Sequence, residues 1–108
     1  MSWRGRQNTA TGDQYKEPLR AIQLAAGAST GSATITEMGW VGLSMRAVGA
    51  DIRYEFGAPA NASTSHFIAQ NERLFVATPW GAGDLSINAI RDASTNGVLE
   101  ITVVREYS

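Results

Sequence analysis

The sequence contains no cysteine and only one histidine among its 108 residues. Without cysteine the chain forms neither disulfides nor thiolate metal sites. His66 has no second histidine or cysteine with which to share a metal ion, and no nearby serine resembles a nucleophile elbow. The sequence therefore predicts no metal, no cofactor and no catalytic residue, and we expect a protein that is not an enzyme.

The chain also lacks a charge excess and a long apolar run. Nine basic residues against ten acidic ones give a net charge of −1, so the phosphate-driven affinity of a nucleic-acid-binding protein is not expected. No segment approaches the roughly 18 consecutive apolar residues of a membrane span, and the N-terminus has no apolar signal region. We expect a protein made in the cytoplasm with neither nucleic acid nor membrane as a partner.

The composition changes near residue 20. Residues 1–20 carry a net charge of +2 and few apolar side chains, whereas the rest of the chain carries −3 and nearly all the aliphatic residues. The sequence predicts an extended N-terminal arm over residues 1–20 and one folded domain over residues 21–108.

Most of residues 21–108 alternates apolar and polar side chains with the period of two that is typical of half-buried strands. The alternation is strongest over residues 50–56, 85–89 and 98–103, and turn residues recur about every ten positions. Both features predict an all-β protein, a single antiparallel β-sandwich of the jelly-roll type. The expected core residues are Ile52, Tyr54, Phe56, Leu85, Ile87, Leu99, Ile101 and Val103.

Tryptophan and arginine are the best candidates for contacts with a partner, since both are enriched at interface hot spots. Trp40 opens an apolar strand pattern and is expected in the core, whereas Trp80 lies in a glycine-rich loop and Trp3 in the polar arm. Asp51 and Glu55 share one strand face, as paired catalytic carboxylates or as part of a solvated surface. The predicted partner-binding residues are Trp3, Arg4, Arg6, Tyr15, Arg20, Pro59 and Trp80.

The pattern of turns and apolar positions between residues 47 and 104 extends over about half of the chain. A strand ends in Phe56-Gly57, a loop rich in proline, alanine and serine follows, and two short apolar strands lead to Pro79. The motif "INAIR" at residues 87–91 is then joined by a Thr-Asn-Gly turn to "LEIT" at residues 99–102. This block resembles small all-β virion proteins of tailed bacteriophages.

The resemblance implies a capsid decoration or cement protein that stabilises the head shell. The implied partners are the major capsid protein and further copies of the chain, as a homotrimer, and the implied location is the capsid surface of the virion. Similar proteins also serve as head-to-tail connectors or tail components. The residues leave two other classes open: a carbohydrate-binding module that uses Trp80 or Trp40, and an enzyme that uses His66 or Asp51.

Overall fold

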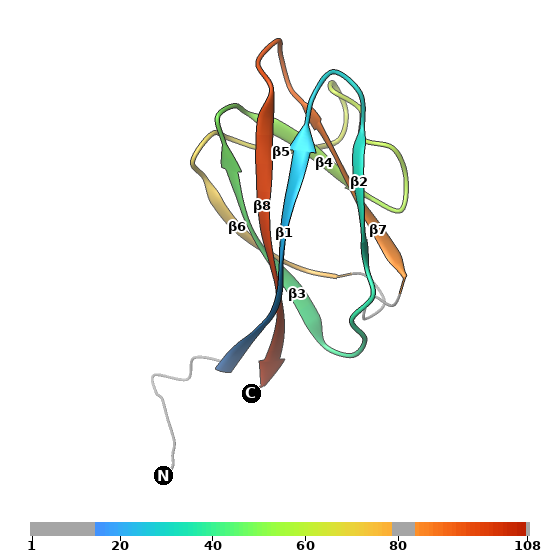
Figure 1. The fold of residues 1–108 in the computed structure, drawn as a ribbon, viewed down its shortest axis with the longest axis vertical. Helices are drawn as coiled ribbons and strands as arrows, with labels where there is room; N and C mark the ends of the chain where they lie inside the picture. Colours follow the sequence, from blue (N-terminus) through green and yellow to red (C-terminus); the bar gives the residue numbers. More distant parts are fainter. Residues whose placement is uncertain (1–14, 79–83, 108) are drawn as a thin grey trace.

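The structure is a computed structural model that describes residues 15–78 and 84–107, and these residues form eight β-strands and no helix (Figure 1). The described part therefore contains no helix that could cross a membrane. The strands are β1 (Tyr15–Ala26), β2 (Gly31–Ile35), β3 (Val41–Val48), β4 (Ile52–Phe56), β5 (His66–Ile68), β6 (Arg73–Ala77), β7 (Leu85–Arg91) and β8 (Gly97–Tyr107).

The strands form two four-stranded antiparallel sheets. Sheet A has the order β1-β8-β3-β6 and sheet B the order β2-β7-β4-β5. The first strand pairs with the eighth, the second with the seventh, the third with the sixth and the fourth with the fifth. The chain is thus one long antiparallel hairpin rolled into two layers, which is the jelly-roll topology. The predicted all-β sandwich is confirmed.

The core lies between the two sheets and consists of the inward-facing residues of both. Six of the eight predicted core residues are buried, namely Ile52, Tyr54, Ile87, Leu99, Ile101 and Val103. Phe56 packs against this cluster but stays partly exposed, and Leu85 is also only partly buried. Both lie at strand ends, where the sandwich opens to solvent.

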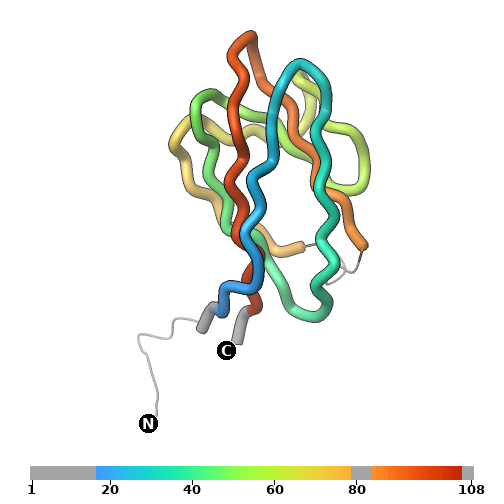
Figure 2. Tube along the Cα trace, viewed as in Figure 1, coloured from blue at the N-terminus to red at the C-terminus, as the bar shows by residue number. Residues whose placement is uncertain are grey.

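The N-terminal boundary differs from the expected one. β1 begins at Tyr15 and pairs with β8 along its length, from Tyr15 opposite Tyr107 to Ala26 opposite Gly97 (Figure 2). Residues 15–20, which the composition assigned to the arm, are therefore the first half of an edge strand. A β-bulge between Pro18 and Arg20 interrupts the register there. Residues 1–14 lie outside the described part of the chain.

Candidate interaction surface

The turn between β2 and β3 exposes two large apolar side chains. Met38 is 72% and Trp40 86% exposed, and we call residues 36–40 the Trp40 turn. The turn lies at the lower end of the sandwich in Figure 1. The expectation that Trp40 is a core residue is wrong. The buried phase of β3 runs through Val41, Leu43 and Met45, so residue 40 stands one position out of phase with it.

Backbone geometry directs the indole outward. Gly39 adopts φ of 88°, in the left-handed region that favours glycine, and the Val41 N–H donates to the Gly39 carbonyl at 2.9 Å. This bond spans two residues, as in a γ-turn with Trp40 at its centre. The chain therefore reverses around Trp40 while Val41 enters the core.

An ion pair holds the start of the turn. Arg20 projects from β1 next to the bulge, and its Nε and Nη2 atoms donate to the two carboxylate oxygens of Glu37 at 2.9 and 3.1 Å. Nη2 also donates to the Thr34 carbonyl at 2.9 Å. The hydrogen bonds from Arg20 lower the pKa of Glu37 below its ordinary value. Arg20 is thereby committed to an internal contact that joins sheet A to the end of β2.

A second arginine reaches the turn from β8. Arg105 Nη2 lies 3.5 Å from the Met38 carbonyl oxygen, and Arg105 Nη1 lies 4.0 Å from a carboxylate oxygen of Glu17 in β1. The Trp40 turn is therefore attached at Glu37, at Met38 and, through the γ-turn, at Val41. These attachments present Met38 and Trp40 to solvent on an ordered backbone.

The outer face of sheet B carries a polar network. Asn88 is 5% exposed; its side-chain oxygen accepts from the Ser32 hydroxyl, and its amide donates to the Ser86 hydroxyl at 3.2 Å. Arg53 Nε donates to Asp92 at 2.8 Å. Most of the polar side chains on this face are thus paired within the molecule.

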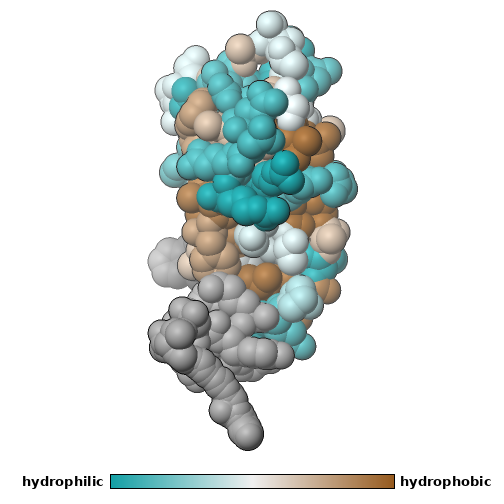
Figure 3. All heavy atoms as spheres, turned by 90° about the vertical axis from the view of Figure 1, so that its left-hand side faces the viewer, coloured by the Kyte–Doolittle hydropathy of each residue, from teal (hydrophilic) through white to brown (hydrophobic). Residues whose placement is uncertain are grey.

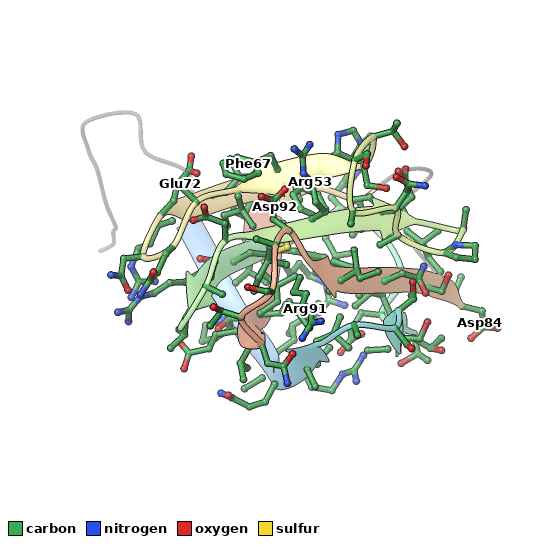
Figure 4. All side chains as sticks on the ribbon, turned by 90° about the horizontal axis from the view of Figure 1, so that it is seen from above. Arg53, Phe67, Glu72, Asp84, Arg91 and Asp92 are labelled. Atoms are coloured by element: carbon green, nitrogen blue, oxygen red, sulfur yellow. The ribbon has the colours of Figure 1, made fainter. Side chains whose placement is uncertain are left out.

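Arg53 also covers an aromatic ring on this face. Its guanidinium carbon lies 4.9 Å from the centre of the Phe67 ring, and its Nη1 donates to the Ser65 carbonyl at 2.9 Å. Figure 4 shows Arg53, Asp92 and Phe67 gathered on one side of the sandwich. The stacked arginine leaves Phe67 partly shielded from water.

The residues with enzymatic potential do not form a catalytic arrangement. Glu55 accepts from the Ser65 hydroxyl at 2.9 Å, and its other oxygen lies 3.8 Å from His66 Nε2. The carboxylate stands between the hydroxyl and the imidazole, so His66 is not placed to take a proton from Ser65.

Asp51 lines a shallow hollow together with Gln70 and Thr95, among others. Its carboxylate accepts from the Gln70 backbone N–H at 2.7 Å, so it supports a loop. Within residues 15–78 and 84–107, no three histidine or acidic side chains are grouped in a way that would hold a metal ion.

Of the predicted partner-binding residues, the structure describes the side chains of Arg20 and Pro59 only. Pro59 is exposed in the β4–β5 connection, which lies at the right of the sandwich in Figure 1, whereas the Trp40 turn lies at its lower end. Thr30, which donates to the Ala60 carbonyl at 3.1 Å, fixes this connection. The backbone of Tyr15 begins β1, and its side chain is not among those described. Trp3, Arg4, Arg6 and Trp80 lie outside the described residues.

The sequence analysis expects Trp40 in the core and does not identify Met38, although both are exposed. A usable signal was present, because the alternation of β3 fixes its buried phase at odd-numbered positions and Gly39 marks a turn directly before it. Taken together, these two features place Trp40 in the turn rather than in the strand.

No protein-family model matches the chain, and no curated protein is detectably similar to it. Among solved structures, the crystal structure of PirA superposes with a TM-score of 0.48 at 19% identity, over 77% of this chain and 92% of that chain. A similarity of this size carries no information about function.

Proposed function

We propose that the protein is a non-enzymatic structural component of a tailed-phage virion. In this proposal it is a capsid decoration or cement protein that binds the major capsid protein at the head surface. The observation that carries the proposal is the Trp40 turn, where two large apolar side chains are held in solvent by an ordered backbone.

An exposed tryptophan and methionine on a fixed turn suit attachment to another protein. Tryptophan is enriched at interface hot spots, and methionine adapts its shape to a partner surface. Because Arg20, Glu37 and Arg105 already order the turn, binding loses little backbone entropy there. An attachment site of this kind needs no catalytic group.

The fold and the sequence pattern are compatible with this role. Jelly rolls occur in viral capsid proteins and in lectins, but fold alone does not define function. The turn and strand pattern between residues 47 and 104 that resembles phage virion proteins is what favours the capsid. The homotrimer and the contribution of Trp3, Arg4, Arg6 and Trp80 stay predictions.

Purified particles of the phage that encodes the protein provide the test. Mass spectrometry should find the protein in many copies per head, and capsids depleted of it should rebind the purified chain. Trp40→Ala should weaken rebinding by at least about tenfold, because it removes a potential hot-spot side chain. Trp40 is 86% exposed, so the variant should keep the stability of the wild type.

Phe67→Ala is the matched control, since it also removes an exposed aromatic ring, on the outer face of sheet B. It should rebind like the wild type. Absence of the protein from purified particles contradicts the virion role, and equal rebinding by the Trp40 variant contradicts the proposed attachment site. A few copies per particle would instead indicate a head-to-tail connector or tail component.

The second candidate is a carbohydrate-binding module, because an exposed indole is also a stacking surface for a sugar ring. That function requires a saccharide to quench tryptophan fluorescence in the wild type but not in Trp40→Ala. Saccharide binding without particle binding would favour this candidate over the virion role.

A further inference from the structure

The outer face of sheet A differs from an ordinary solvated sheet surface. Inward-facing residues alternate with outward-facing ones along each strand, so the register defines the outer set. Among the outer residues whose side chains the structure describes, nine are apolar or glycine and three are charged; Lys16 and Glu106, paired at the far end of the same face, continue the set in the register. The described members are Pro18, Ala21, Gln23, Ala25, Gly42, Ser44, Arg46, Val48, Arg73, Phe75, Ala77, Val98, Glu100, Thr102 and Val104.

Most of these side chains are small, and the one large ring, Phe75, lies over Gly42. A Cβ atom added to Gly42 would stand 2.7 Å from the Phe75 ring, so the ring occupies the space above the glycine. Phe75 itself is 40% exposed. Val104, opposite Gly42 on β8, is 6% exposed although it is not part of the inner core cluster. The small exposed members of this face, among them Ala21 and Ala77, suit close packing against another flat surface.

The three charged residues with described side chains on this face lie in one row across the sheet. Arg73 stands opposite Arg46, Arg46 opposite Glu100, and Glu100 opposite Gln23. Among the described residues, the side chains of Arg73 and Glu100 form no hydrogen bond or ion pair, and the Arg46 side chain has only a 3.4 Å contact with Asn71. Like charges directly across a strand pair destabilise a sheet. The charges of this row are therefore not fully balanced by ion pairs within one molecule.

We propose that this face pairs with the same face of a second copy, around a two-fold axis that runs parallel to the strands between β3 and β8. The inference does not depend on the capsid role, and it favours a two-fold pair over the homotrimer that the resemblance implies. Rotation about this axis keeps each row at its height and reverses its order, so β3 faces β8 of the other copy and β6 faces β1. A symmetric pair must contact itself in this reciprocal way.

The reversed rows are complementary in charge and in size. Arg46 of each copy faces Glu100 of the other, so this contact occurs twice, and Arg73 faces Gln23. In the next row the bulky Phe75 faces Ala21. An in-plane axis perpendicular to the strands would instead set the charges against apolar rows, and burying them unpaired is costly. Charge complementarity therefore selects a second copy in one orientation.

The interface is small. Four strands about 4.8 Å apart and about eight residues long present roughly 500 Å² per copy, or about 1,000 Å² in total. This area is near the lower limit for a specific protein interface, so the dimer should be weak and dependent on concentration. Figure 3 shows apolar residues on both sides of a hydrophilic band in the described part of the surface that it draws.

Sedimentation velocity of the full chain, from low micromolar to millimolar concentration, tests the proposal. The wild type should shift from monomer to dimer over this range. Arg46→Glu creates two contacts between carboxylates across the axis, and Glu100→Arg creates two contacts between guanidinium groups. Each variant alone should dimerise at least about tenfold more weakly than the wild type.

A mixture of the two charge variants is the decisive measurement. The carboxylate introduced by Arg46→Glu then faces the guanidinium introduced by Glu100→Arg. The unchanged Glu100 of the first variant faces the unchanged Arg46 of the second, so both contacts become attractive. The mixture should recover a one-to-one heterodimer, although neither variant pairs with itself. Recovery of this kind also shows that both variants are folded.

Thr34→Arg, which adds a charge to an exposed position on the outer face of sheet B, is the control and should leave dimerisation unchanged. The proposal is overturned if the wild type stays monomeric at millimolar concentration or forms a trimer. It is also overturned if either charge variant dimerises like the wild type, or if the mixture does not associate while circular dichroism shows both variants folded.

Discussion

The outer faces of the two sheets differ in how their polar side chains are paired. On sheet B the polar groups bind one another: Asn88 with Ser32 and Ser86, and Arg53 with Asp92. On sheet A most outer residues are small and apolar, and the side chains of Arg73 and Glu100 have no partner among the described residues. Most polar side chains on the outer face of sheet B are paired within the monomer. In the described part of the chain, the outer face of sheet A keeps unpaired charged side chains and exposed apolar residues that a partner could contact.

The comparison shows that burial alone does not distinguish a surface for water from a surface for a partner. Asn88 on sheet B and Val104 on sheet A are nearly equally buried, at 5% and 6% exposed. Asn88 is buried by hydrogen-bonding neighbours, whereas Val104 lies in a row of apolar side chains that continues to the surface. Pairing of polar groups, rather than exposure, separates the two faces.

The largest expected effect separates the inner from the outer side of sheet A. Ile101 is 1% exposed in the core, and Ile101→Ala should lower the free energy of unfolding by about 2–5 kcal/mol. Thr102 is the next residue and points to the outer face, so Thr102→Ala should change it by less than about 0.5 kcal/mol. Urea unfolding followed by circular dichroism, at a concentration low enough to keep the chain monomeric, measures both.

A similar cost for the two variants would show that the outer face of sheet A contributes to the monomer's own core. A cost below about 0.5 kcal/mol for Ile101→Ala would contradict the assignment of the buried side of β8.

An intermediate effect should separate the two outer faces. Arg53 holds Asp92, the Ser65 carbonyl and the Phe67 ring, so Arg53→Ala should cost about 1–2 kcal/mol. Arg46→Ala on sheet A removes only a 3.4 Å contact with Asn71 and should cost less than about 0.5 kcal/mol. The same unfolding measurement applies. Equal costs would mean that both faces stabilise the monomer alike.

The fold followed from the sequence because period-two alternation is local. The alternation of residues 50–56 and 98–103 marks the strands and their buried sides without any knowledge of their neighbours. The first half of β1 was assigned to the arm because Lys16, Pro18 and Arg20 make it look polar. Its strand conformation depends on pairing with β8, which is more than eighty positions away in the chain.

The candidate surfaces depended even more on long-range pairing. That Arg46 faces Glu100 on one side and Arg73 on the other follows from the register of three strands that are distant in sequence. The contact of Arg20 with Glu37 likewise depends on how β1 and β2 meet at the edge of the sandwich. Only the exposure of Trp40 could be predicted from its neighbours in the chain, because Gly39 marks a turn before it and Val41 begins the buried positions of β3.

The smallest expected effect concerns the ion pair that links the two sheets beside the Trp40 turn. Hydrogen bonds from Arg20 lower the pKa of Glu37 below its ordinary value, so the carboxylate is stabilised by folding. A group with a lowered folded pKa contributes stability above its unfolded pKa and loses that contribution as the pH falls through the folded value. For a partly exposed pair the contribution is about 0.2–1 kcal/mol.

Glu37→Gln should therefore be less stable than the wild type at neutral pH by about this amount, and the difference should shrink as the pH falls below the ordinary pKa of a glutamate and through the lowered pKa of Glu37. Thermal unfolding at a series of pH values measures the difference. In an Arg20→Gln background Glu37 has lost its partner, so the added Glu37→Gln change should show little of this pH dependence. A difference that stays constant from neutral to acid pH would show that Glu37 acts by packing rather than by charge. The Trp40 turn would then be held by Arg105, the backbone of Gly39 and the packing of Glu37, and not by the charge of the Arg20–Glu37 pair.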